Sequence, residues 1–119
     1  MRHKVKSKRL NRPREQLKAL MRSLAISAVL YENIETTRDK AKMLRSFVDR
    51  LISRAKRKDK VSAIRYLQKH INNKDASLKI METLVPRFKE RDSGFSRFIN
   101  TRICQGNAAQ LVLFQILPE

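Results

Sequence analysis

Apolar residues recur along most of the chain at the three- and four-residue spacing of a helix face. Two long stripes come before residue 60: Leu17, Leu20, Met21, Leu24 and Ala28, then Ala41, Leu44, Val48, Leu51, Ile52 and Ala55. Two shorter stripes follow: Val61, Ile64, Leu67 and Ile71, then Leu78, Met81, Leu84, Val85 and Phe88. The pattern predicts four amphipathic helices, each of which buries one face.

Local signals indicate where some of these helices begin or bend. Pro13 lies at the expected first turn of the first helix, where its missing N–H costs nothing. Thr36 and Asp39 form a T-x-x-D pattern, so we expect Thr36 to cap the second helix. Pro86 falls inside the fourth stripe and is expected to kink or divide that helix.

Three segments have the composition of β-strands instead. Residues 32–36, 97–104 and 110–117 are rich in β-branched and aromatic residues, and a turn signal at 105–108 separates the last two. The last segment alternates little between apolar and polar residues, which predicts a strand covered on both faces. Together these elements predict an α+β domain in which a small three-stranded sheet packs against about four helices.

The charge is distributed unevenly along the 119 residues. There are 28 Lys and Arg against 11 Asp and Glu, a formal net charge of +17. Residues 1–14 hold seven cations and no acid, residues 38–60 hold ten cations and three acids, and residues 103–118 hold no charge. We therefore expect residues 1–12 to form an extended, disordered basic arm and residues 13–119 to form a single domain.

The composition excludes several classes of protein. The longest apolar runs have four residues, far fewer than a membrane span needs, and the basic start lacks the apolar stretch of a secretory signal. The only cysteine, Cys104, excludes an internal disulfide and fits a reducing compartment. We expect a cytoplasmic protein without a membrane partner.

Catalytic and metal chemistry lack the residues that they need. His3, His70 and Cys104 are the only His and Cys residues, too few for a four-ligand structural zinc site. No nucleophile motif accompanies either histidine, and two glycines cannot form a phosphate-binding loop. The sequence predicts no enzyme, no metal, no cofactor and no small-molecule substrate.

A chain with so high a density of positive charge repels itself unless a polyanion neutralises it, and nucleic acid is the first candidate for that polyanion. No helix-turn-helix, zinc-finger or RNA-recognition motif is present, and aromatic residues make up only 6%, so base stacking cannot be the main mode. Backbone contact with a large structured RNA remains the leading hypothesis. A DNA-compacting protein is the alternative, and binding to an anionic membrane is a third. The predicted phosphate contacts are Arg2, His3, Lys4, Lys6, Lys8, Arg9, Arg12, Arg14, Arg22, Lys42, Arg45 and Arg97.

Six short motifs in order are similar to one known family. They are Met1-Arg2-His3 with Leu10-Asn11-Arg12, Ala19 to Ala25, Ile34 to Thr37 with Lys40-Ala41-Lys42, Leu51-Ile52 with Ala55-Lys56, Pro86-Arg87-Phe88, and Gly94 to Arg97. From end to end the chain resembles the bacterial-type large-subunit ribosomal protein number seventeen. It departs from the family at Phe95-Ser96, where Tyr-Thr is usual, and at Asn107 and Gln115, where acidic residues are common.

The resemblance implies a small mixed sheet packed with helices and a structural role without catalysis. It also implies that the protein binds and stabilises large-subunit ribosomal RNA near the outer mouth of the nascent-chain tunnel. Neighbouring ribosomal proteins are the other partners that it implies, and the ribosome in the cytoplasm is the implied location.

Overall fold

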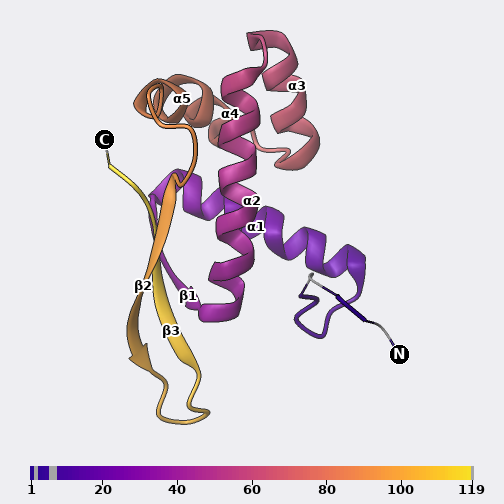
Figure 1. Cartoon of the computed structure of the whole chain (residues 1–119), viewed down its shortest axis with the longest axis vertical. Helices are drawn as coiled ribbons and strands as arrows, with labels where there is room; N and C mark the ends of the chain where they lie inside the picture. The colour runs from indigo at the N-terminus through magenta and orange to yellow at the C-terminus, as the bar shows by residue number, and fades with distance from the viewer. Residues whose placement is uncertain (2, 6–7, 119) are drawn as a thin grey trace.

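The computed structural model describes residues 1, 3–5 and 8–118, and it packs a three-stranded sheet against helices (Figure 1). In chain order the elements are α1 (Arg14–Tyr31), β1 (Asn33–Thr37), α2 (Arg38–Arg57), α3 (Lys60–His70), α4 (Lys74–Lys79), the π-helical turn η1 (Ile80–Leu84), α5 (Val85–Arg87), β2 (Ser96–Ile103) and β3 (Gln110–Ile116). The predicted α+β class is confirmed.

The sheet has the order β1-β3-β2, and both pairs of strands are antiparallel. Phe114 in the central strand lies opposite Ile34 on one side and Phe98 on the other. The mixed sheet implied by the family resemblance is therefore not observed. The short loop between β2 and β3 requires an antiparallel pair, whereas the long helical connection between β1 and β2 would allow either direction.

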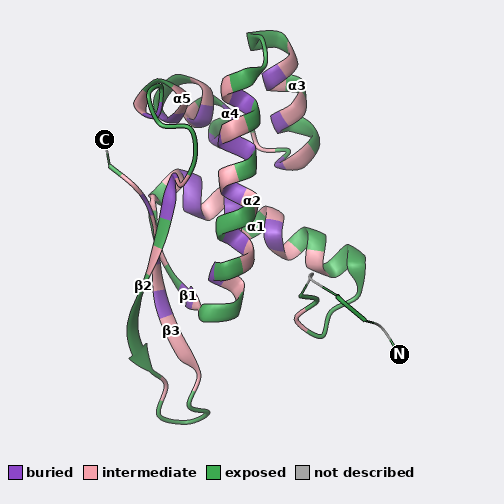
Figure 2. Ribbon diagram, in the orientation of Figure 1, coloured by how far each residue is buried: buried purple, intermediate pink, exposed green. Residues whose placement is uncertain are grey.

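The core lies between one face of the sheet and the helices, with α2 running along its length (Figures 1 and 2). The predicted stripe of α2 is confirmed, because each of its six members is at most 2% exposed. From the sheet, β3 contributes Val112, Phe114 and Ile116, and α1 contributes Ala25, Ala28 and Val29. Small residues on α1 allow its backbone to lie close to the other elements.

The other face of the sheet is not covered, which contradicts the prediction for the last strand. Leu111 and Leu113 are only half-buried, and Ile99 in β2 is 47% exposed. Burial along β3 thus alternates as in an ordinary one-sided sheet. The prediction was wrong because the outward positions carry apolar residues, which hides the alternation in the sequence.

The helix caps agree only partly with the sequence signals. Asp59 and Asn73 cap α3 and α4 by accepting hydrogen bonds from backbone N–H groups three residues later. The N-cap of α2 is Thr37, without a side-chain cap, so the predicted cap at Thr36 is wrong. Thr36 is the buried residue of β1, and the alternation of that strand turns it towards the core, opposite Val112.

The fourth predicted helix is continuous from α4 through η1 to α5, and Pro86 does not divide it. The N–H of Val85 bonds to the carbonyl of Ile80, five residues earlier. This wider turn gives space to the proline ring, which would clash with the preceding turn of a regular α-helix. It also shifts the buried stripe to a four-residue spacing at Ile80, Leu84 and Phe88.

Two apolar residues of the predicted stripes are at the surface instead. Leu78, which precedes the π-helical turn, is 43% exposed, because the real stripe passes through Ile80. Val61 lies in the first turn of α3 and is 57% exposed, while Ala63 and Leu67 face the core. Among the described residues, no helix combines the length and the apolar character needed to cross a bilayer.

The departures from the family pattern at residues 95 and 96 fit the core. Phe95 is fully buried, and its ring centroid lies 5.1 Å from that of Phe88, so this position takes a ring without a hydroxyl. Ser96 keeps a hydroxyl, which donates to Oδ1 of Asp49 at 2.9 Å and joins β2 to α2. Burial raises the pKa of the Asp49 carboxyl, although the bond from Ser96 opposes this.

Candidate nucleic-acid interface

The basic arm reverses direction just before α1. The N–H of Arg12 donates to the carbonyl of Arg9 at 3.0 Å, and the two residues between them have positive φ. Directly before this turn, Nζ of Lys8 donates to Oδ1 of Asp39 at 2.6 Å. The end of the arm therefore lies against the first turn of α2.

The ion pair between Lys8 and Asp39 is at the surface, where each side chain is more than half exposed. The ammonium group holds the pKa of the Asp39 carboxyl below its usual value. Exposed pairs of this kind contribute little free energy, so a phosphate can compete with Asp39 for Lys8.

A groove between α1 and α2 lies beside this pair. Its floor is formed by Met21, Met43 and Phe47. We call this floor, together with the Lys and Arg side chains that line the two hollows described next, the α1–α2 groove. One hollow of about 430 Å³ over this floor is lined by Lys8, Lys42 and Arg50. A second hollow of about 320 Å³ over the same floor is lined by Arg14, Lys18 and Lys69.

The groove brings together three of the predicted contacts, Lys8, Arg14 and Lys42. It adds Lys18, Arg50 and Lys69, which the sequence-based set did not include. The four-residue spacing of Arg14 with Lys18 could have indicated the first of these, because such pairs share a helix face. Nothing in the sequence places Lys69 here, since α3 approaches α1 only in the folded chain.

Three predicted contacts lie elsewhere. Nε of Arg22 donates to the carbonyl of His70 at 3.2 Å and joins α1 to the end of α3. Arg97 is exposed on the outward face of the sheet, where its Nε donates to Oε1 of Gln115 at 2.8 Å. Arg45 is exposed on α2 but does not line the groove. These three residues are not gathered with the arm.

The remaining predicted contacts belong to the arm. His3, Lys4, Arg9 and Arg12 are exposed. Arg2 and Lys6 lie outside the described residues.

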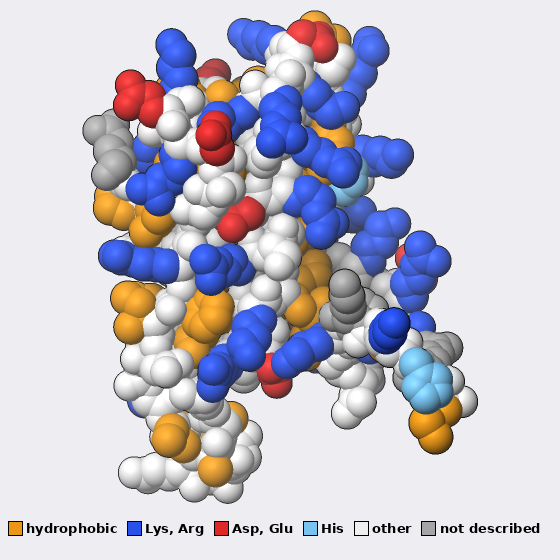
Figure 3. All heavy atoms as spheres, viewed as in Figure 1, with side chains coloured by type: hydrophobic (Ala, Val, Ile, Leu, Met, Phe, Trp, Pro, Cys, Tyr) orange, Lys and Arg blue, Asp and Glu red, His pale blue; other side chains and the backbone are white. Residues whose placement is uncertain are grey.

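A second cationic surface lies where α2 turns into α3. We call it the α2–α3 corner, and its exposed members are Arg54, Arg57, Lys58, Lys60 and Arg65. Two of these cations lie over the ring of Tyr66, with centroid distances of 5.6 and 5.4 Å. Cations near an aromatic face are held in place without losing their charge. Lys and Arg side chains cover much of the face seen in Figure 3, where acidic side chains are sparse.

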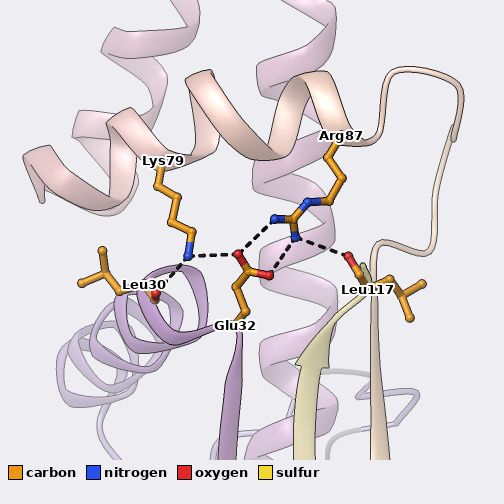
Figure 4. A network of polar contacts seen from close by, with 5 residues as sticks. All are labelled: Leu30, Glu32, Lys79, Arg87 and Leu117. Carbon is orange, nitrogen blue, oxygen red and sulfur yellow. Dashed lines mark hydrogen bonds and ion pairs between the residues drawn. The ribbon is translucent and has the colours of Figure 1, made fainter. Parts of the chain in front are cut away.

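Other cations are used inside the protein. Glu32, which directly follows α1, lies between Nζ of Lys79 at 3.0 Å and Nη1 of Arg87 at 2.8 Å (Figure 4). Nζ of Lys79 also donates to the carbonyl of Leu30 at 2.9 Å, and Nη1 of Arg87 reaches that of Leu117 at 3.5 Å. The hydrogen bonds from Arg87, helped by Lys79, lower the pKa of Glu32 to about 2 despite partial burial. This network joins α1, α4, α5 and the end of the chain.

The fold and this surface define a class: a small, strongly basic α+β protein whose cations gather at a groove and at a helix corner. The family model described as Ribosomal protein L17 matches residues 20–117. The chain therefore belongs to the ribosomal protein L17 family. Members of this family are structural parts of the ribosome, so the predictions of the family and of a non-enzymatic protein are confirmed.

Individual relatives match along the whole chain. A protein of Campylobacter concisus is 39% identical over 119 residues, covering all of both chains. One of Petrotoga mobilis is 36% identical over 126 residues, covering all of this chain and 98% of the relative. One of Orientia tsutsugamushi strain Boryong is 38% identical over 119 residues, covering all of this chain and 81% of the relative. Each of the three is named large ribosomal subunit protein bL17.

Proposed function

We propose that this protein is a structural constituent of the large ribosomal subunit that binds ribosomal RNA through contacts with phosphates. The full-length similarity to proteins named for the large subunit is the observation that carries the proposal. The α1–α2 groove supports it, because its rim offers cations from three different helices to one ligand. Contacts of this kind position an RNA backbone without reading its sequence.

The arm and the groove act together in this proposal. The turn at Arg9–Arg12 and the pair between Lys8 and Asp39 put the end of the arm beside the groove. An RNA strand that enters the groove therefore meets the arm as well. On the grounds of its charge, we propose that the arm, residues 1–12, is disordered in the free protein, where the exposed pair between Lys8 and Asp39 forms only transiently, and that it becomes ordered on RNA. Residues 13–119 fold as one domain in this proposal.

Two separate surfaces allow the protein to bridge RNA segments. The α1–α2 groove lies beside the first part of α2, and the α2–α3 corner lies at its end. A helix of 20 residues extends for about 30 Å, which exceeds the width of a single RNA groove. We propose that one RNA segment contacts the groove and the arm, and that another contacts the corner.

The resemblance to the family supports a position near the exit of the nascent-chain tunnel, with neighbouring ribosomal proteins in contact. Residues 103–118, which include the turn between β2 and β3 and all of β3, carry no charged side chain; Ile103 is exposed among them and Ile99 beside them. This part of the hairpin offers a surface for protein rather than phosphate. Chemical cross-linking of isolated large subunits tests this position. Cross-links to proteins that surround the exit are expected, and cross-links confined to the subunit interface would contradict the location.

Co-sedimentation tests the function itself. After a high-salt wash, the protein is expected to remain with large subunits and to be absent from small subunits. The purified chain should also prefer structured ribosomal RNA to duplex DNA at equal salt. Preference for duplex DNA, together with loss from washed subunits, would instead support a DNA-compacting protein.

A further inference from the structure

The floor of the α1–α2 groove has a chemistry that phosphate contacts do not need. Met21, Met43 and Phe47 present thioether and aromatic surface to two adjoining hollows of about 430 and 320 Å³. Met21 is 7% exposed, and Met43 and Phe47 are half-buried, so the apolar surface lies at the base of a depression. In Figure 3 an orange apolar patch is visible between α2 and α1, with blue cationic side chains above and below it.

The ring of Phe47 differs from those of Tyr66, Phe88 and Phe95 in its partners. Phe88 and Phe95 contact each other, and Tyr66 contacts His70 and two cations. Within the described part of the chain, Phe47 has neither an aromatic ring nor a cation over its face. Its ring is therefore available for stacking.

The rim of the groove indicates the charge of the ligand. It contains Lys8, Arg14, Lys18, Lys42, Arg50 and Lys69, from the arm and from α1, α2 and α3. Among the described residues that line the two hollows, none is acidic. A ligand that fits this groove has an apolar, flat part for the floor and several negative charges for the rim. An apolar protein segment or an acyl chain satisfies only the first condition.

We propose that the α1–α2 groove binds an unstacked nucleotide, with its base on Phe47 and the flanking phosphates held by the cations of the rim. Bases in RNA loops and bulges are free to leave the stack and to pack on aromatic side chains. Such stacking tolerates any base, because every base has a π face. This inference rests on the proposed RNA binding and adds one base contact to a mode dominated by phosphates.

Two RNA oligomers that carry the same phosphates separate the base from the backbone. The first is a ten-residue oligouridylate, and the second is a ten-residue oligomer of abasic ribose phosphates. The full chain is expected to bind the oligouridylate about tenfold more tightly, as one stacked base would give. Phe47→Leu should remove most of this preference and leave the affinity for the abasic oligomer unchanged.

Phe98→Leu is the matched control, because Phe98 is also half-buried but lies on β2. It is expected to keep the preference, with folding of both variants checked by circular dichroism. A photocross-link from 5-iodouridine in the same oligomer, mapped by mass spectrometry on the unaltered chain, should fall on Phe47. Equal binding of the two oligomers, or cross-links only elsewhere, would overturn the base site while phosphate binding stands. Failure of both oligomers to bind would overturn the proposed RNA binding as well.

Discussion

At the scale of single residues, three acidic side chains join elements of the fold, and many cations remain for a ligand. Glu32 satisfies two cations at once, and Asp49 accepts a hydrogen bond from β2. Glu35 pairs with Arg102 on the outward face of the sheet at 2.9 Å, which raises the pKa of that guanidinium. Glu32, Glu35 and Asp49 thus lie where separate elements meet, and none of them lines the groove.

Glu32→Gln tests the most connected of these joints. The carboxylate is partly buried, and its removal leaves Lys79 and Arg87 beside a neutral amide. We expect the free energy of unfolding at pH 7 to fall by about 2 kcal/mol. Urea unfolding followed by circular dichroism measures this, and Glu90→Gln, at an exposed position, is the control that should change little.

The same carboxylate predicts a dependence on pH. The pKa of Glu32 is about 2 in the folded protein against 4.5 for an unperturbed carboxyl, so the unfolded chain takes up the proton first. The stability contributed by Glu32 is complete above the higher value and is lost as the pH falls through the lower one. Unfolding curves between pH 5 and pH 2 should therefore show a steeper loss for the unaltered protein than for Glu32→Gln. Parallel curves for the two proteins would contradict this role.

Asp39→Asn tests the contact between the arm and α2. Asp39 competes with phosphate for Lys8, so its neutralisation should tighten RNA binding by about twofold to fivefold at low salt. Asp92→Asn changes the net charge equally, but at an exposed position in the loop before β2. Filter binding of both variants to the same RNA separates a local effect from the total charge, and equal gains would contradict the local competition.

At the scale of elements, the periodicity of apolar residues predicted the structure well wherever an element buries only one face and that face alone is apolar. The stripe of α2 was predicted residue by residue, and the three strands were located to within about one residue of their ends. The π-helical turn was not predictable from the apolar spacing. A regular 3.6-residue period does not indicate where a helix accommodates one extra residue in a turn. The bare outward face of β3 was missed because Leu111 and Leu113 are apolar at positions that no helix covers.

The candidate site was predictable only where charge is concentrated in sequence. The arm is evident from seven cations in 14 residues, and Lys42 from the basic face of a helix. The groove itself depends on the crossing of α1 and α2, and its members Met43, Phe47 and Lys69 come from elements brought together by tertiary packing. Arg22 is a cation that bonds within the protein, to the carbonyl of His70. The sequence does not reveal this, because the two residues meet only in the folded chain.

Substitutions at two adjacent residues of β3 test whether helices cover only one face of the sheet. Phe114→Asp buries an unpaired charge or forces the carboxyl to take up a proton, at a cost of several kcal/mol. Leu113→Asp puts the same group on the outward face opposite Glu35, where repulsion costs about 1 kcal/mol or less. Thermal melts should show an unfolded Phe114→Asp and a cooperatively folded Leu113→Asp. A cooperative melt for Phe114→Asp would contradict the position of the core.

At the scale of the whole molecule, the charge of +17 makes the free protein repel itself and makes a polyanion its stabilising partner. Much of this charge is gathered at the arm, the α1–α2 groove and the α2–α3 corner. RNA affinity should accordingly depend on several surfaces, each of which contributes its own share of the salt dependence. No single substitution should abolish binding.

Deletion of residues 2–12 measures the share of the arm. This segment contains six Lys and Arg residues, and if about five of them contact phosphates, the slope of log affinity against log salt should become shallower by roughly 3–5. The slope should remain clearly negative, because the groove loses only Lys8 from its rim and the corner keeps its cations. A full-length variant with glutamine at the six positions is the matched control, since it keeps the chain length and should show the same change. An unchanged slope would mean that the arm does not contact phosphates. A slope near zero after deletion would mean that the groove and the corner face only water, and that the arm alone carries the interaction with RNA.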